Sequence, residues 1–150
     1  MGFNIVLLEP EIPNNTGNIG RLSLASGSHL HLVKPFGFEL DDKRVKRAGL
    51  DYWQYLTLTI YQNAEEFFEI HKNKKMAFLS SHGTKDHWDI DFIDEMFLVF
   101  GKESAGISKD ILETNAHQLF KIPIYNEHIR SLNLANAVGI VVYEGLRCLR

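Results

Sequence analysis

The sequence predicts an α/β fold in which a mostly parallel sheet is covered by helices on both faces. Short apolar runs alternate along the chain with amphipathic segments of helical spacing. Strands separated by helical patterns are typical of βαβ units and therefore of parallel strands. No linker, repeat or low-complexity stretch interrupts the pattern, so we expect residues 1–150 to form a single domain.

Each expected element rests on a local pattern. Runs of apolar, β-branched and aromatic residues predict strands at 3–8, 29–33, 56–61, 76–80, 96–100 and 119–124. Helical spacing and charged helical patterns predict helices at 19–27, 41–49, 64–71, 108–115 and 132–149. The Pro- and Asn-rich stretch 10–17 predicts a turn before the first helix.

Polar residues and a glycine mark the expected helix ends. Asn15 or Thr16 can cap the first helix, and Gly27 can stop it. Ser108 is placed to cap the fourth helix, and Ser131 is placed to cap the last one.

The last helix carries two adjacent apolar strips. One strip contains Leu132, Ala135, Gly139, Val142, Leu146 and Leu149, and the other contains Leu134, Val138 and Val141. Packing against the sheet accounts for such strips. Their combined width also suits pairing with a second copy of the chain, so both interpretations stay open.

The composition is that of an ordinary globule, with 45% hydrophobic residues and a formal net charge of −3. No apolar run approaches the roughly 18 residues of a membrane helix, and the N-terminus has no signal-peptide pattern, so we expect no membrane partner. The single cysteine, Cys148, fits a reducing, cytoplasmic location. No residues lie at the spacing of a metal site, so we expect no metal.

Three loops rich in Gly, Asn and small polar residues each follow an expected strand. Ligands of open α/β sheets bind beyond the carboxyl ends of strands, so these loops are the first candidate sites. The first loop, 13–21, places Arg21 one turn inside a helix whose N-terminus favours an anion. A turn with a cap and a solvated Arg21 is the simpler interpretation.

The second loop, 100–108, is close to a phosphate-binding loop in sequence. Ile107 stands where that loop needs a lysine, which argues against it. Close approach of a ligand to the backbone better explains Gly101 at the strand end. Glu103 is then a buried or substrate-facing carboxylate, or else a solvated loop acid.

The third loop, 122–137, places Asn133 and Asn136 on one face near a helix N-terminus, for capping or for ligand contact. A separate basic cluster lies in the second expected helix and contains Lys43, Arg44, Lys46 and Arg47. It is a footprint for nucleic-acid phosphates or a solvated helix face. Tyr52 and Trp53 follow it, and they can stack on an unpaired base or pack in the core.

In this order, the three loops resemble the three motifs of the SPOUT superfamily of S-adenosylmethionine-dependent RNA methyltransferases, and in particular its SpoU branch. The likeness rests on residues 14–21, 101–106 and 130–137, continuing to Glu144, and it covers nearly the whole chain. It is greatest for the minimal tRNA 2′-O-methyltransferases of the wobble nucleotide, which residues 42–53 also resemble.

The resemblance implies a homodimer whose C-terminal part forms a deep trefoil knot. It implies S-adenosyl-L-methionine as methyl donor, S-adenosyl-L-homocysteine as product, and tRNA as partner. By position, the implied cofactor residues are Leu79, Gly101, Ile122, Ser131 and Leu132.

The resemblance also implies that Arg21 is catalytic and that Asn15, Glu103 and Asn133 position the reacting groups. A guanidinium stays protonated in proteins. We therefore interpret Arg21 as an electrostatic clamp on the ribose 2′-oxygen or an adjacent phosphate rather than as a base. The expected RNA contacts are Lys43, Arg44, Lys46, Arg47 and Arg130.

Two departures from the family pattern concern the second and third loops. Close relatives often carry Pro and Arg at the positions of Lys102 and Ala105, so this chain lacks any RNA contact made by that Arg. Ala135 stands where Ser is common, which removes one hydroxyl from the expected pocket.

The main hypothesis is a tRNA 2′-O-methyltransferase that acts on the wobble nucleotide, a cytidine or a modified uridine at position 34. One alternative is 2′-O-methylation at another tRNA or rRNA site. A second is a non-catalytic, knotted RNA-binding dimer, and a third is a small nucleotide-binding regulator that uses the Gly101 loop.

Overall fold

The computed structural model describes residues 2–41, 43–48 and 52–150, and it describes only the backbone of residues 44, 46 and 48. Within these ranges one sheet contains the strands β1 (Asn4–Leu8), β2 (His29–Val33), β3 (Leu58–Tyr61), β4 (Met76–Leu79), β5 (Lys85–Asp86), β6 (Phe97–Phe100) and β7 (Leu119–Lys121). Their order is β3-β2-β1-β6-β4-β7-β5, and every neighbouring pair is parallel. The α/β prediction is confirmed, and the trefoil knot stays a prediction.

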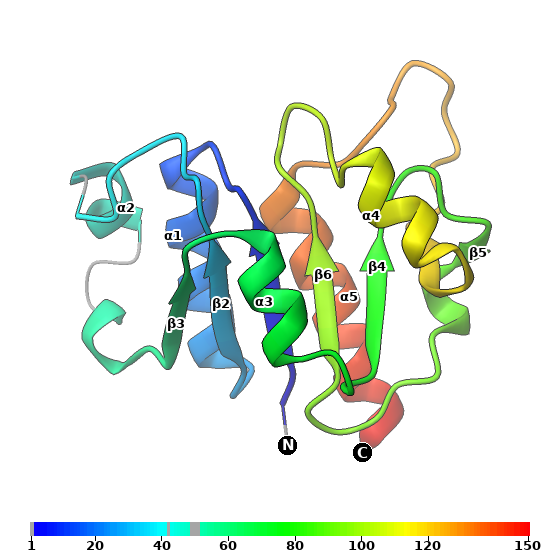
Figure 1. The fold of residues 1–150 in the computed structure, drawn as a ribbon, viewed down its shortest axis with the longest axis horizontal. Coiled ribbons are helices and arrows are strands. Elements are labelled where there is room, and N and C mark those ends of the chain that lie inside the picture. The colour runs from blue at the N-terminus through cyan, green and yellow to red at the C-terminus, as the bar shows by residue number, and fades with distance from the viewer. Residues whose placement is uncertain (1, 42, 49–51) are drawn as a thin grey trace.

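Helices cover both faces of this sheet (Figure 1). Alternate residues of the buried strands point to opposite faces, so that Ile5 and Leu98 enter one core while Val6 and Val99 enter the other. The helices α1 (Pro13–Ala25) and α5 (Leu134–Leu149) cover the first core, and α3 (Ala64–Ile70) and α4 (Lys109–Thr114) cover the second. The short helix α2 (Lys43–Ala48) packs beside α1. Because every neighbouring pair of strands is parallel, all the strands end at the same edge of the sheet.

Helix α1 begins earlier than the sequence predicted. It starts at Pro13, and the residue before it, Ile12, has no side chain that can cap. Proline suits the first helical position because its fixed φ is already helical and its missing N–H has no partner to lose. Asn15 and Thr16 lie inside the helix, so the prediction that either caps it is wrong.

The predicted boundaries near the C-terminus also shift. Asn133, not Ser131, caps α5, because its Oδ1 accepts hydrogen bonds from the N–H groups of Ala135 (2.9 Å) and Asn136 (3.3 Å). Strand β7 ends at Lys121, two residues before Pro123, which has no N–H to donate to a neighbouring strand.

Helix α5 lies beside α1 and buries mainly the second of its two apolar strips. Its buried residues are Leu134, Val138, Val141, Val142 and Gly145. Ile140 and Tyr143 on the same helix stay 41% and 48% exposed, which leaves an apolar surface on the outside of the chain. None of the helices among the described residues is long and apolar enough to cross a membrane.

Candidate functional site

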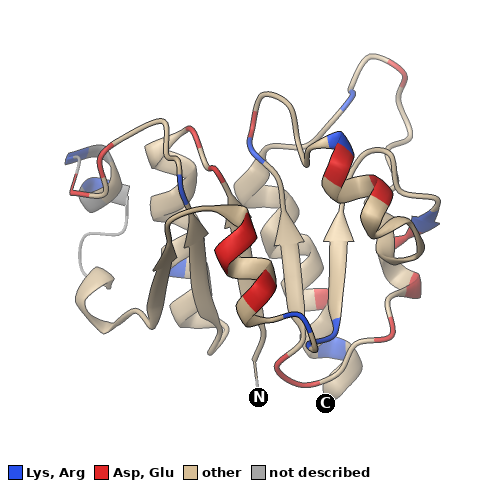
Figure 2. Cartoon of the chain, viewed as in Figure 1, with Lys and Arg blue, Asp and Glu red and all other residues tan. Residues whose placement is uncertain are grey.

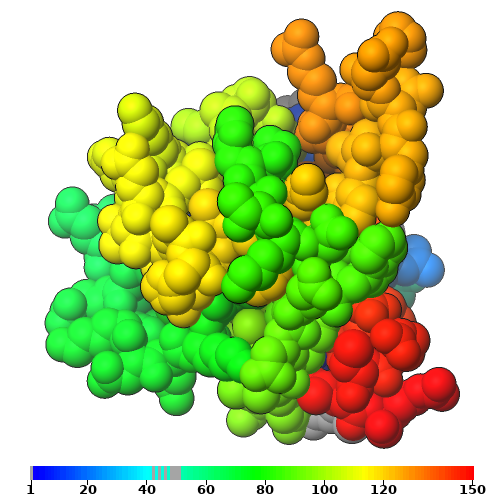
Figure 3. All heavy atoms as spheres, turned by 90° about the vertical axis from the view of Figure 1, so that its right-hand side faces the viewer, coloured from blue at the N-terminus to red at the C-terminus, as the bar shows by residue number. Residues whose placement is uncertain are grey.

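A cavity of about 570 Å³ lies beyond the carboxyl ends of β4, β6 and β7. Its walls come from the loops that follow these strands, from the start of α1 and from the segment that leads into α5. The surface is visibly hollowed between the segment after β4, in green, and the orange segment after β7 (Figure 3). The volume is within the range of small-ligand pockets, and the position is where open parallel sheets bind ligands.

All five residues that the resemblance implied for the cofactor line this cavity. They are Leu79, Gly101, Ile122, Ser131 and Leu132. Leu79 is the last residue of β4, and Gly101 directly follows β6, so the sheet places both at its carboxyl edge. Their part in binding stays a prediction.

The loop after β6 is folded tightly on itself. A Cβ atom on Gly101 would lie 2.2 Å from the carbonyl carbon of Gly106 and 2.3 Å from the nitrogen of Ile107. Gly106 has a φ of +68°, and its N–H donates to the carbonyl of Lys102 at 2.8 Å. Gly101 is therefore required by its own loop, and because it also lines the cavity, its interpretation as a point of close approach for a ligand stays a prediction.

Glu103 joins this loop to the start of α1. Its Oε1 accepts from the N–H of Glu11 (2.8 Å), and its Oε2 accepts from the N–H of Ile12 (2.9 Å) and from Nδ2 of Asn15 (3.2 Å). A carboxylate at a helix N-terminus satisfies free N–H groups and interacts favourably with the helix dipole. Glu103 thus satisfies, from a distant loop, the two backbone N–H groups that immediately precede α1.

Asn15 connects Glu103 to the third motif. Its Nδ2 donates to Glu103, and its Oδ1 accepts from Nδ2 of Asn133 at 3.1 Å. Asn15 is buried, and Asn133 also caps α5 as described above. The structure therefore brings Asn15, Glu103 and Asn133 into one hydrogen-bonded row along the cavity wall.

Arg21 lies apart from this row. It is exposed, and its guanidinium carbon lies 4.5 Å from the centre of the Tyr52 ring, a distance typical of a cation–π contact. It follows Asn15 by six residues, which is about 9 Å along the helix axis. The cavity lining given by the described residues contains Asn15 but not Arg21.

The predicted RNA contacts fall into two regions. Arg130 lines the cavity and is exposed, whereas Lys43 and Arg47 are exposed on α2. Helix α2 lies at the left end of the view, at a distance from the loops after β4 and β7 (Figure 2). The side chains of Arg44 and Lys46 lie outside the described part of the structure.

The two aromatic residues after α2 both pack against residues of α1. Tyr52 lies under Arg21, and Trp53 packs on α1, where a Cβ on Gly20 would come within 2.7 Å of its ring. Both are half-buried, which agrees with the packing interpretation rather than with stacking on a base.

One part of the cavity wall was missed from the sequence. Residues 80–82 follow β4 and line the cavity, and the N–H of Ser80 donates to the carbonyl of Phe120 at 2.9 Å. The sequence could have indicated this part of the wall, because the polar loop directly follows an expected strand.

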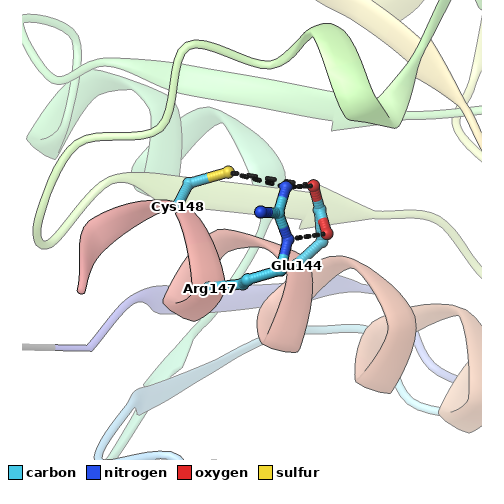
Figure 4. Close-up of polar contacts among 3 residues, drawn as sticks. All are labelled: Glu144, Arg147 and Cys148. Carbon is cyan, nitrogen blue, oxygen red and sulfur yellow. Dashed lines mark hydrogen bonds and ion pairs between the residues drawn. The ribbon is translucent and has the colours of Figure 1, made fainter.

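Glu144, at the end of the third motif, forms its hydrogen bonds within α5 and is not among the described residues that line the cavity. Glu144 accepts two hydrogen bonds from Arg147, at 3.0 and 2.7 Å, and Sγ of Cys148 lies 3.8 Å from the same carboxylate (Figure 4). The bonds from Arg147 are the main cause that lowers the pKa of Glu144. Among the described residues, no group of three or more His, Cys, Asp or Glu is arranged to hold a metal ion.

Comparison with known proteins gives a consistent result over almost the whole chain. The model of the SpoU rRNA Methylase family matches residues 2–143. A tRNA (cytidine(34)-2′-O)-methyltransferase of Escherichia coli is 44% identical over 148 residues, which are 98% of this chain and 94% of the relative. The protein of the same name from Saccharophagus degradans is also 44% identical, over 98% of this chain and 96% of its own length.

Solved structures agree with these relatives. A structure that concerns the 2-OH methylation of C/U34 on tRNA superposes with a TM-score of 0.93 at 38% identity and covers 98% of this chain and 95% of its own. An AdoMet-bound rRNA methyltransferase from Sinorhizobium meliloti has a TM-score of 0.88 at 26% identity, over 99% of this chain and 57% of its own.

Proposed function

The chain belongs to the SpoU rRNA methylase family, and from this membership we propose that it methylates the ribose 2′-hydroxyl of the wobble nucleotide of tRNA. The observation that carries the proposal is the 44% identity, over nearly the full length of both chains, to a tRNA (cytidine(34)-2′-O)-methyltransferase. The substrate nucleotide is a cytidine or a modified uridine at position 34.

We propose S-adenosyl-L-methionine as the cofactor of the cavity described above. The walls fit such a molecule, because Leu79, Ile122 and Leu132 offer apolar surface while Gly101 and Ser131 offer peptide and hydroxyl groups. When bound, the cofactor supplies an electrophilic methyl group, and its product is S-adenosyl-L-homocysteine.

The residues of the chain then have to align and polarise the ribose hydroxyl. Asn15 and Asn133 hold one wall of the cavity in place through their mutual hydrogen bond. Arg21 is the electrostatic clamp on the 2′-oxygen or a neighbouring phosphate, since a guanidinium keeps its charge and favours developing alkoxide character. Arg130 and the exposed cations of α2 contact the RNA backbone.

We further propose a homodimer that pairs through the exposed apolar surface of α5, where Ile140 and Tyr143 lie. Each copy is a single domain spanning residues 1–150, because the described strands all belong to one sheet. A tRNA substrate and a lone, unpaired cysteine suit the cytoplasm.

The test is a methylation assay on transcripts of one tRNA that differ only at the wobble base. We expect methyl transfer that depends on S-adenosyl-L-methionine, with the product mapped by mass spectrometry to the ribose of nucleotide 34. Methylation mapped to any other nucleotide contradicts the proposed site. A chain that S-adenosyl-L-methionine does not stabilise against heat contradicts enzymatic function and favours an RNA-binding dimer.

A further inference from the structure

A second acid mirrors the contact made by Glu103. The carboxylate of Glu11 accepts hydrogen bonds from the N–H of Ser104 at 2.8 Å and from its Oγ at 3.0 Å. Glu11 directly precedes Ile12, and Glu103 directly precedes Ser104. Each of the two loops therefore offers a carboxylate to the backbone of the other, and we refer to these five hydrogen bonds as the clasp.

The clasp holds a loop whose tip is otherwise at the surface. Ser104, Ala105 and Gly106 are exposed, yet they line the cavity. Within the loop, the turn is closed by the bond from Gly106 N–H to the Lys102 carbonyl at 2.8 Å. That bond shapes the turn but does not fix its position against α1, which the contacts of Glu11 and Glu103 do.

Glu11 is ionised under ordinary conditions. The two bonds from Ser104 are the main causes that lower its pKa, and Lys102 acts in the same direction. Hydrogen bonds to an ionised acceptor are about twice as strong as those between neutral groups.

We propose that Glu11 is a positioning residue for methyl transfer: it seats the 101–107 loop against α1 and thereby keeps Glu103 aimed at Asn15. The effect passes from Ser104 through the loop to Glu103, and from Asn15 to Asn133 by their hydrogen bond. This role rests on the proposed function, since the cavity wall that Glu11 fixes is the one assigned to the cofactor.

The experiment compares E11A with E11Q. Both bonds from Ser104 are exposed to solvent, so we expect E11A to bind S-adenosyl-L-methionine about three- to tenfold more weakly in calorimetry. E11Q retains an acceptor for the Ser104 N–H but loses the charge, so its affinity should lie between those of E11A and the wild type. E113A removes an exposed acid on α4 and serves as the control with unchanged affinity.

Two further measurements separate positioning from general destabilisation. E11A and E103A should be non-additive in binding free energy, because both residues hold the same loop. Amide hydrogen exchange of Ser104, measured without cofactor, should be slow in the wild type and fast in E11A.

Wild-type affinity in E11A, or an E11Q variant as weak as E11A, overturns the proposal. A wild-type chain that binds no S-adenosyl-L-methionine overturns the proposed function and the role of Glu11 in transfer together. In that case the exchange of the Ser104 amide still shows whether the clasp forms.

Discussion

His31 is a buried titratable side chain of the core. It is 2% exposed and lies in the middle of β2, stacked on His29 at 4.0 Å between ring centres. Nδ2 of Asn4 donates to the carbonyl of Glu95, so its Oδ1 must accept from Nε2–H of His31 at 2.8 Å. Nδ1 of His31 is then left to accept from the hydroxyl of Tyr61, also at 2.8 Å. In the neutral form of His31, this network places the proton on Nε2.

This neutral tautomer predicts acid sensitivity. Burial is the main cause that lowers the pKa of His31, to about 3, and neighbouring His29 and His71 act in the same direction. Between about pH 3 and pH 6.5 the unfolded chain therefore binds a proton that the folded chain does not, and stability falls as the pH falls. We expect His31 alone to lower the free energy of unfolding by about 2 kcal/mol between pH 7 and pH 5.

Urea unfolding at both pH values tests this expectation. His31→Phe should be less stable at pH 7 but should lose less stability on acidification than the wild type does. His128→Asn, a substitution at an exposed position, should keep the wild-type dependence. An unchanged dependence in His31→Phe contradicts the assignment.

Arg21 offers a second test at the scale of one residue. It lies outside the cavity lining, so its removal should not disturb the cofactor. We expect Arg21→Ala to lower the turnover number about 100-fold, the order of one lost electrostatic contact in a transition state, with the affinity for S-adenosyl-L-methionine within about twofold. Single-turnover methylation and calorimetry measure the two quantities, and a wild-type turnover number removes Arg21 from the reaction.

At this scale the sequence predicted which residues meet, but not how they bond. Asn15, Glu103 and Asn133 were grouped by the resemblance, and the structure places them in one row. Glu11 was not singled out, because a glutamate in a turn looks like a solvated acid until its partner is known. That partner, Ser104, lies 93 residues away.

Among the elements, α5 carries a matched pair of glycines. A Cβ on Gly145 would lie 2.5 Å from the ring of Phe3 and 2.8 Å from that of Phe92, both buried. Among the described residues, a Cβ on Gly139 would meet only Leu22 within 4 Å, at a comfortable 3.8 Å. The two positions differ in packing while sharing one helix.

We expect opposite effects from alanine at these two sites. Gly145→Ala should lower the free energy of unfolding by about 1–3 kcal/mol, because the overpacked rings cannot shift cheaply. Gly139→Ala should raise it by up to about 1 kcal/mol, since alanine favours the helix. Denaturant unfolding measures both, and equal changes of the same sign contradict the packing explanation.

Element positions were predictable where burial alone decides them. Strands β1 and β2 are runs of apolar residues, and their predicted positions agree with the structure to within one residue. The start of α1 was missed although Pro13 marks it, because Asn15 and Thr16 also looked like caps. Strand β5 has two residues and an exposed edge, so it leaves no pattern that a sequence can reveal.

At the scale of the whole molecule, the proposed homodimer depends on the exposed apolar surface of α5. Ile140 and Tyr143 are too exposed to stabilise the single chain. We expect Ile140→Glu to reduce the mass measured by light scattering from that of a dimer to that of a monomer, because a charge buried in the interface opposes association. Ile70→Glu, at a 59% exposed isoleucine on α3, is the matched control and should remain dimeric. A wild-type chain that is monomeric contradicts the dimer itself.

The contact between Asn15 and Asn133 spans 118 positions of the chain. The cavity is therefore complete only when the segment that leads into α5 lies beside the start of α1. Folds dominated by such distant contacts form slowly, because the loops between the partners must close first. During synthesis Asn133 is added long after β1 and β2, so the early part of the chain lacks this wall of the cavity. A growing chain thus has no complete cavity until this C-terminal wall has been made.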